Sequence, residues 1–106
     1  MYEPSKYARL FDEDCYNWQN NREMNKFYME AMQTYANDLL KYRGYVFLRD
    51  IYEKIGFKVS KDSITAGWHM SDTDHVSMQI ILSDDVNDSS IIVEFRDVNE
   101  DITVYF

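Results

Sequence analysis

The sequence predicts an α+β domain in which two N-terminal helices cover one face of a C-terminal, four-stranded antiparallel meander. Residues 22–56 carry apolar side chains at helical spacing, whereas residues 63–106 alternate between apolar and polar side chains as strands do. A composition of 45% hydrophobic and 16% aromatic residues excludes a disordered chain. Because 106 residues suit one hydrophobic core, we expect residues 1–106 to form a single two-layer domain.

Residues 1–21 form a polar segment that is rich in aromatic side chains. Ser5 is a favourable N-cap for a short helix over Lys6–Asp14, although acidic residues at the C-terminal end oppose the helix dipole. Tyrosine and tryptophan are preferred interface anchors, so this segment is a candidate contact surface. Its candidate contact residues are Tyr7, Phe11, Tyr16 and Trp18, and exposed aromatic side chains are also expected at Tyr2 and Tyr105. The sequence leaves open the alternative that the segment folds back over the helical layer.

The clearest element of the chain is a long amphipathic helix. Asn20 and Glu23 resemble a capping box at its start, and Gly44 follows a basic last turn, as a C-cap glycine does. A second helix is expected over Val46–Ile55, with Gly56 ending it. The residues that follow helical spacing on the first helix are Met24, Phe27, Tyr28, Ala31, Met32, Tyr35, Leu39 and Tyr42.

Beyond residue 63 the hydrophobic period changes from 3.6 to 2. The predicted strands cover about residues 64–70, 76–82, 91–96 and 102–106. The connections Ser71–Asp74, Ser83–Ser89 and Asp97–Asp101 are short and polar, as hairpin loops are. In a meander the first and third of these loops would lie at the same end of the sheet.

Charge is unevenly distributed along the chain. Residues 1–61 carry ten Lys or Arg and nine Asp or Glu, whereas residues 62–106 carry ten acidic residues and a single basic one, Arg96. An acidic surface repels phosphates, which argues against direct nucleic-acid binding and favours a basic protein partner. The acidic candidates are Asp72, Asp74, Asp97, Glu100 and Asp101 at one predicted end of the sheet, and Asp84, Asp85 and Asp88 at the other. The alternative is a solvated surface whose aspartates serve solubility and turn chemistry.

The sequence does not predict an active site. His69, Asp72, Asp74 and His75 could ligate zinc or manganese, but we favour two exposed histidines on an acidic hairpin. Acidic neighbours raise the pKa of the Cys15 thiol, which argues against a thiol nucleophile. The chain has no phosphate-binding glycine loop and no nucleophile elbow. We expect no enzymatic activity, cofactor or metal.

The expected location is the cytoplasm. A single cysteine cannot form an internal disulfide, which fits a reducing compartment. No apolar run approaches the ~20 residues that a membrane span needs. The N-terminal residues lack the cationic and apolar regions of a signal peptide. We expect no membrane contact.

Three motifs carry a resemblance to a known family. They are DLLKYRGYVFLRDIYEKIG at residues 38–56, Ala66-Gly67-Trp68, and IIVEF at residues 91–95. With these motifs the chain, over about residues 27–104, resembles an uncharacterised domain family of phages and prophages of Gram-positive bacteria. The resemblance implies a small protein of a mobile element that acts inside a bacterial host. Its motifs are structural and transfer no catalytic role.

An acidic protein of such origin suggests an inhibitor of a bacterial defence nucleoprotein, similar to anti-CRISPR proteins. The acidic C-terminal half would act as a DNA mimic in the Lys/Arg-rich groove of a partner such as a CRISPR effector. The alternative is a phage structural or assembly accessory protein that works by protein–protein contact. It would use residues 1–21 as its contact, including contact with a second copy in a homodimer.

Overall fold

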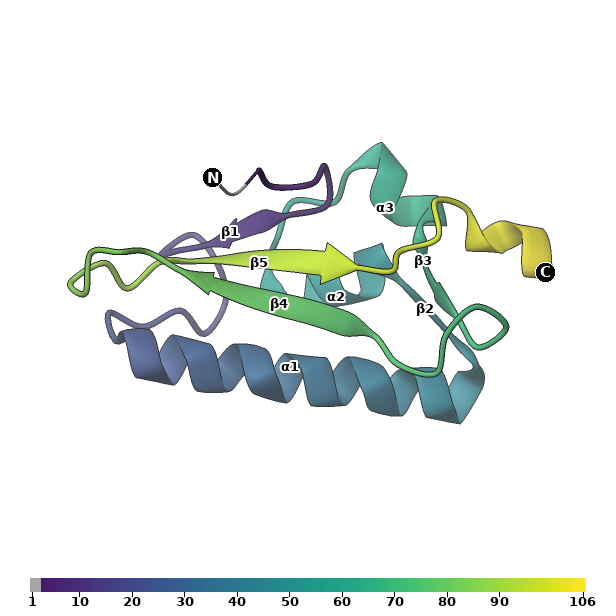
Figure 1. Ribbon diagram of the computed structural model, residues 1–106, viewed down its shortest axis with the longest axis horizontal. Helices are drawn as coiled ribbons and strands as arrows, with labels where there is room; N and C mark the ends of the chain where they lie inside the picture. The colour runs from purple at the N-terminus through teal and green to yellow at the C-terminus, as the bar shows by residue number, and fades with distance from the viewer. Residues whose placement is uncertain (1–2) are drawn as a thin grey trace.

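The computed structural model describes residues 3–106, which form helices and short strands in two antiparallel sheets. In chain order the elements are β1 (Arg9–Phe11), α1 (Arg22–Arg43), β2 (Tyr45–Phe47), α2 (Leu48–Ile55), α3 (Lys61–Thr65), β3 (Gly67–His69), β4 (Ser77–Leu82), β5 (Ile91–Arg96) and the 3-10 helix η1 (Ile102–Tyr105). One sheet has the order β1-β5-β4 and the other pairs β2 with β3. Figure 1 shows α1 running lengthwise along the three-stranded sheet. The α+β class is confirmed, whereas the four-stranded meander is wrong.

The N-terminal segment forms a strand in place of the predicted helix over Lys6–Asp14. β1 pairs antiparallel with β5, so that Phe11 lies opposite Ile91 and is fully buried. Ser5, the predicted helix cap, instead donates its backbone N–H to Glu94 Oε2 at 2.9 Å. Pairing with β5 and burial of Phe11 outweigh the local helical preference, because a short helix is marginal without tertiary support.

The long helix forms as predicted, with its N-cap shifted by one residue. Asn21, and not Asn20, caps α1, because its Oδ1 accepts the Met24 backbone N–H at 3.1 Å. Gly44 ends the helix with φ 85°, a left-handed conformation that glycine adopts without a Cβ penalty. Sequence signals at both ends therefore locate α1 to within a residue.

The buried face of α1 differs from the predicted apolar face. Its fully buried residues are Asn25, Met29, Ala36 and Leu40. Tyr28, Met32 and Leu39 are partly buried against the core, whereas Met24, Phe27, Tyr35 and Tyr42 are exposed. The helix is apolar over a wider arc than the sheet and α2 cover, so one side of that arc remains in solvent.

Two asparagines of α1 form hydrogen bonds with the backbone just before β4 and β5. The Asn25 side chain donates to the Ser89 carbonyl at 2.9 Å and bonds both backbone groups of Gln19. The Asn37 Oδ1 accepts the Val76 backbone N–H at 2.6 Å. These bonds tie α1 to the segments that lead into β5 and β4, and they satisfy backbone groups that the sheet leaves unpaired.

The second predicted helix begins two residues later than expected, at Leu48. Tyr45–Phe47 is instead β2, in which Val46 pairs with Trp68 of β3. The two strands approach closely at Gly67, where an added Cβ would lie 2.1 Å from the Val46 carbonyl oxygen. Gly56 ends α2 as predicted, again with a positive φ, of 99°.

Two predicted strands are wholly or partly helical. Residues 61–65, where the strand over 64–70 was expected to begin, form α3, whose start is fixed by the Ser60 N–H donating to Ser63 Oγ at 3.0 Å. The predicted strand over 102–106 is η1, because Asp101 Oδ1 accepts the Thr103 N–H at 3.0 Å and turns the chain. At residues 102–106 the apolar alternation reflects one buried residue, Ile102, and not strand pairing, whereas Gly67–His69 of the other predicted strand does pair, as β3.

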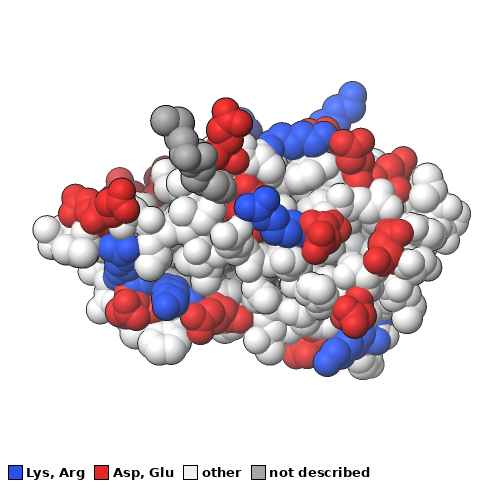
Figure 2. Space-filling view, viewed as in Figure 1, with Lys and Arg blue, Asp and Glu red and all other residues white. Residues whose placement is uncertain are grey.

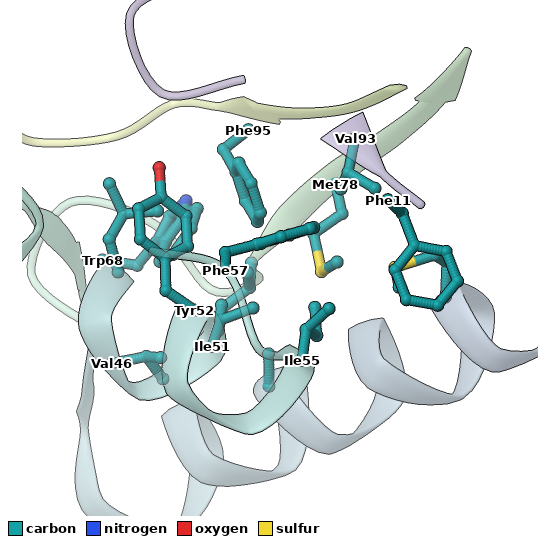
Figure 3. Close-up of a cluster of buried hydrophobic side chains, with 14 of the residues drawn as sticks. Phe11, Val46, Ile51, Tyr52, Ile55, Phe57, Trp68, Met78, Val93 and Phe95 are labelled. Carbon is teal, nitrogen blue, oxygen red and sulfur yellow. The ribbon is translucent and has the colours of Figure 1, made fainter. Parts of the chain in front are cut away.

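The core lies between α1, α2 and the three-stranded sheet. Figure 3 shows Ile51, Tyr52 and Ile55 of α2 directed toward Phe95 and Val93 of β5. Trp68 is fully buried, and its Nε1–H donates to the Arg96 carbonyl at 2.9 Å. Within residues 3–106, none of the helices has the length and apolarity needed to cross a bilayer.

Candidate functional site

Two acidic loops meet at one end of the molecule. Asn99 Nδ2 donates to Asp72 Oδ2 at 2.9 Å, which joins the loop after β3 to the loop after β5. The Tyr105 hydroxyl donates to the other Asp72 oxygen at 2.5 Å. We call the exposed acidic residues of these two loops the loop-end patch: Asp72, Asp74, Asp97, Glu100 and Asp101.

The loops meet for a reason other than the predicted meander. Gly67 and Asn99 form an isolated antiparallel bridge, with backbone hydrogen bonds of 3.0 and 2.9 Å. The segment after β5 therefore runs beside β3, although β3 belongs to the other sheet. The sequence predicts which loops come together but not the contact that joins them.

Hydrogen bonds hold the negative charge of the patch in place. The Asn99 amide, followed by the Tyr105 hydroxyl, lowers the pKa of Asp72, because both donate to its ionised form. A hydrogen bond with His75 lowers the pKa of Asp74 in the same way. Both carboxylates are therefore charged well below neutral pH, and the geometry of Asp72 is fixed before any partner binds.

Cations from the N-terminal half lie among these acids. Lys6 Nζ is 3.6 Å from Glu100 Oε1, an exposed ion pair of little energetic weight. Figure 2 shows acidic groups toward both ends of the visible face, with Lys and Arg groups near them. Folding thus brings basic residues of the N-terminal half beside the acids of the C-terminal half, and the acidic surface is divided into patches.

The second acidic group lies in the β4–β5 hairpin, at the opposite end of the molecule (Figure 1). Asp85 and Asp88 accept the backbone N–H groups of Asn87 and Ser90, both at 2.9 Å, so they shape the turn. Arg22 of α1 donates to the Ser83 carbonyl at 2.8 Å. We call Asp84, Asp85 and Asp88 the hairpin patch. The molecule measures 44 Å along its longest axis, so the two patches cannot act as one small site.

The aromatic N-terminal segment is mostly covered. Phe11 is in the core and cannot serve as an exposed contact, which corrects its assignment as a contact residue. Tyr7 and Trp18 are partly buried against that core, whereas Tyr16 is 62% exposed. Tyr105 is 41% exposed and stacks on His69 at 4.0 Å, and Tyr2 lies outside the described residues. The segment joins the sheet by pairing β1 with β5, and of its four candidates only the Tyr16 ring is mostly exposed.

The described residues show no cluster of side chains that could hold a metal ion. Among them, no three His, Cys, Asp or Glu side chains are arranged to hold an ion. His69 Nδ1 accepts the Ser71 N–H at 3.0 Å, and His75 bonds to Asp74. Burial, followed by the nearby acids, raises the pKa of the Cys15 thiol, in the direction that the sequence predicts.

The surface that sequence reasoning missed is the solvent side of α1. Met24, Phe27, Tyr35 and Tyr42 are exposed there by 46%, 64%, 37% and 93%. The same residues were predicted as the buried face of the helix. The signal that could have found them is the width of the apolar arc, which exceeds what a single covering layer buries.

Comparison with known proteins assigns the chain to a family but gives no activity. A search of curated proteins and a search of solved structures found no match. The model of the family of unknown function DUF6353 matches residues 1–104, nearly the whole length, and the chain belongs to this family.

Proposed function

We propose that this protein acts without catalysis, by binding the Lys/Arg-rich nucleic-acid groove of a partner protein and blocking it. The observation that carries the proposal is the loop-end patch, in which five exposed acids from two loops are gathered at one end of the molecule. Carboxylates arranged on a rigid frame are what a phosphate-binding groove selects, because they offer its cations a similar set of charges.

Rigidity favours this proposal over a purely solubilising surface. A carboxylate that serves only solubility needs no fixed position, whereas Asp72 is held by two side-chain donors from other segments. Asp101 is likewise fixed, because it caps η1. Fixed charges lose less conformational entropy on binding, so each contact contributes more to affinity.

The resemblance to phage and prophage proteins suggests the class of partner. A mobile element that enters a bacterium meets nucleoprotein defences whose guide and target grooves are basic. We therefore propose a bacterial defence nucleoprotein, such as a CRISPR effector, as the partner, and the host cytoplasm as the place of action. The net charge of −8 argues against direct binding to DNA or RNA.

The alternative function is a phage structural or assembly accessory protein that acts through an apolar contact. The exposed apolar side chains of α1 favour it, because large apolar side chains gathered on one face commonly mark a protein contact. The N-terminal segment supports it less, since Phe11 is buried. The two functions differ in their response to salt, because screening weakens contacts between charges far more than apolar contacts.

The test is capture of candidate defence nucleoproteins by the tagged protein, washed at low and at high salt. We would neutralise three patch acids, with Asp74→Asn, Asp97→Asn and Glu100→Gln combined. The one contact to another segment that this removes is the exposed ion pair of Glu100 with Lys6, which has little energetic weight. Asp97 has φ 58°, which Asn tolerates well, so the fold is preserved. Loss of three exposed charge contacts should weaken binding about tenfold.

The matched control removes the same charge elsewhere, with Glu13→Gln, Asp14→Asn and Glu30→Gln combined. These three residues are exposed and lie outside both acidic patches. An equal loss in both triple variants would mean that only net charge matters, and the loop-end patch would be rejected. Binding that persists at high salt and in both variants would favour the apolar alternative.

A further inference from the structure

The solvent side of α1 carries a stripe of exposed apolar side chains. Met24, Phe27, Ala31 and Tyr35 are exposed at successive spacings of three, four and four residues, and Tyr42 extends the row toward the C-terminal end. This spacing places them along one line of the helix, at one side of the buried face. We call these five residues the α1 outer face.

The α1 outer face is more apolar than folding requires. Aromatic residues bury about 150–250 Å² each when fully covered, so exposures of 64% at Phe27 and 37% at Tyr35 leave a large apolar area in water. Within the described chain, Lys54 of α2 lies 5.1 Å from the centroid of the Tyr35 ring, whereas Phe27 and Tyr42 remain mostly exposed. Such a patch indicates a partner surface, because solvent exposure of clustered large apolar groups is otherwise unfavourable.

We propose that the α1 outer face binds the same face of a second copy, with the two helices antiparallel and a two-fold axis near Ala31. Small Ala31 would lie at the centre, where the helix backbones approach most closely. Phe27 would then pack beside Tyr35 of the partner subunit, and symmetry would repeat this aromatic pair on the other side of the axis.

Charge complementarity supports a second copy in this orientation. Glu23, in the first turn of α1, and Lys41, in its last turn, are both exposed and stand 18 residues apart, which is about five helical turns. They therefore share one flank of the stripe. Antiparallel pairing brings Glu23 near Lys41 of the partner subunit at both ends, whereas parallel pairing would leave Glu23 and Lys41 at opposite ends of the contact.

Asp38 fits the same arrangement. It is an exposed acid that lies within the stripe, between Tyr35 and Tyr42. With the axis at Ala31, Asp38 lies opposite Met24 of the partner subunit, in the first turn of that helix. A carboxylate is favourable there, because the N-terminal end of a helix carries partial positive charge.

The expected dimer is weak and reversible. Four or five partly exposed side chains on each copy supply less area than the ~800 Å² per partner of a standard stable interface. We therefore expect a dissociation constant in the micromolar range. Antiparallel pairing would point the two loop-end patches in opposite directions, so dimerisation would leave both of them accessible.

The test is sedimentation equilibrium of the full chain over about 5–500 µM, a range that brackets micromolar affinity. Phe27→Glu should weaken dimerisation at least about tenfold, because it buries a charge at the apolar centre of the contact. The matched control is Val86→Glu, which adds the same charge at a valine that is 78% exposed in the β4–β5 hairpin. This control should dimerise as the parent chain does.

A charge swap tests the orientation. Glu23→Lys and Lys41→Glu should each weaken the dimer by about threefold, and the double variant should restore it. Thermal unfolding of each variant shows whether its helix is intact. A chain that is monomeric over the whole range, a dimer that Phe27→Glu leaves unchanged, or a double swap without recovery would each overturn the proposal. The loop-end triple variant should still dimerise, so this result is independent of the proposed function.

Discussion

The two sides of α1 are similarly apolar in sequence but different in role. The inner side places Met29 and Leu40 in the core and uses Asn25 to hold the segment before β5. The outer side has larger apolar side chains at Phe27 and Tyr42, and they remain in solvent. Hydrophobicity along a helix therefore shows how much surface can be buried, whereas the position of the neighbouring layer decides which side is buried.

The largest effect is expected on the inner side, from Met29→Ala. Met29 is fully buried, so this change removes apolar contacts and leaves a cavity, at a cost of about 2–5 kcal/mol in the free energy of unfolding. Urea unfolding followed by circular dichroism measures the loss. A loss below about 1 kcal/mol would show that the core does not depend on this face.

An intermediate effect is expected from Asn25→Ala, also on the inner side. The Asn25 side chain makes three hydrogen bonds to the backbone of Gln19 and Ser89, and its loss leaves those groups unpaired. We expect a loss of about 1–3 kcal/mol in the free energy of unfolding. Asn87→Ala is the matched control, because Asn87 is exposed and should change the free energy by no more than about 0.5 kcal/mol.

The smallest effect is expected on the outer side, from Phe27→Ala. Phe27 is 64% exposed, so its truncation should change the free energy of unfolding by no more than about 0.5 kcal/mol in dilute protein. The comparison with Met29→Ala, only two residues away, isolates burial as the cause. A large destabilisation of the dilute monomer would mean that the outer side also packs within the chain.

The accuracy of the sequence predictions follows the range of the interactions involved. Helix ends are local, and Gly44 and Gly56 end α1 and α2 where the sequence places the stops. Strands depend on distant partners, and Phe11 becomes part of β1 only because β5 lies beside it. A segment of three residues gives too few alternations to reveal a strand, which is why β1 and β2 were missed.

In the loop-end patch, too, local features could be predicted from the sequence and long-range contacts could not. The sequence places Asp72 and Asp101 in loops, because aspartate favours turns and helix caps. The bond that joins the two loops, from Asn99 to Asp72, connects residues 27 positions apart and cannot be read from either loop alone. Local chemistry predicted the members of the patch, and a long-range contact assembled them.

The sequence by itself determined the α+β class, the extent of α1, the helix stops and the excess of acids from residue 62 onward. These properties depend on composition, on the hydrophobic period and on helix capping, all of which are determined by residues close together in the sequence. Only the tertiary structure decided that the chain forms two sheets, that Phe11 is buried, and that Phe27 and Tyr42 face solvent. The physical reason is that burial is shared between segments far apart in the chain, so which apolar groups leave water depends on which surfaces meet.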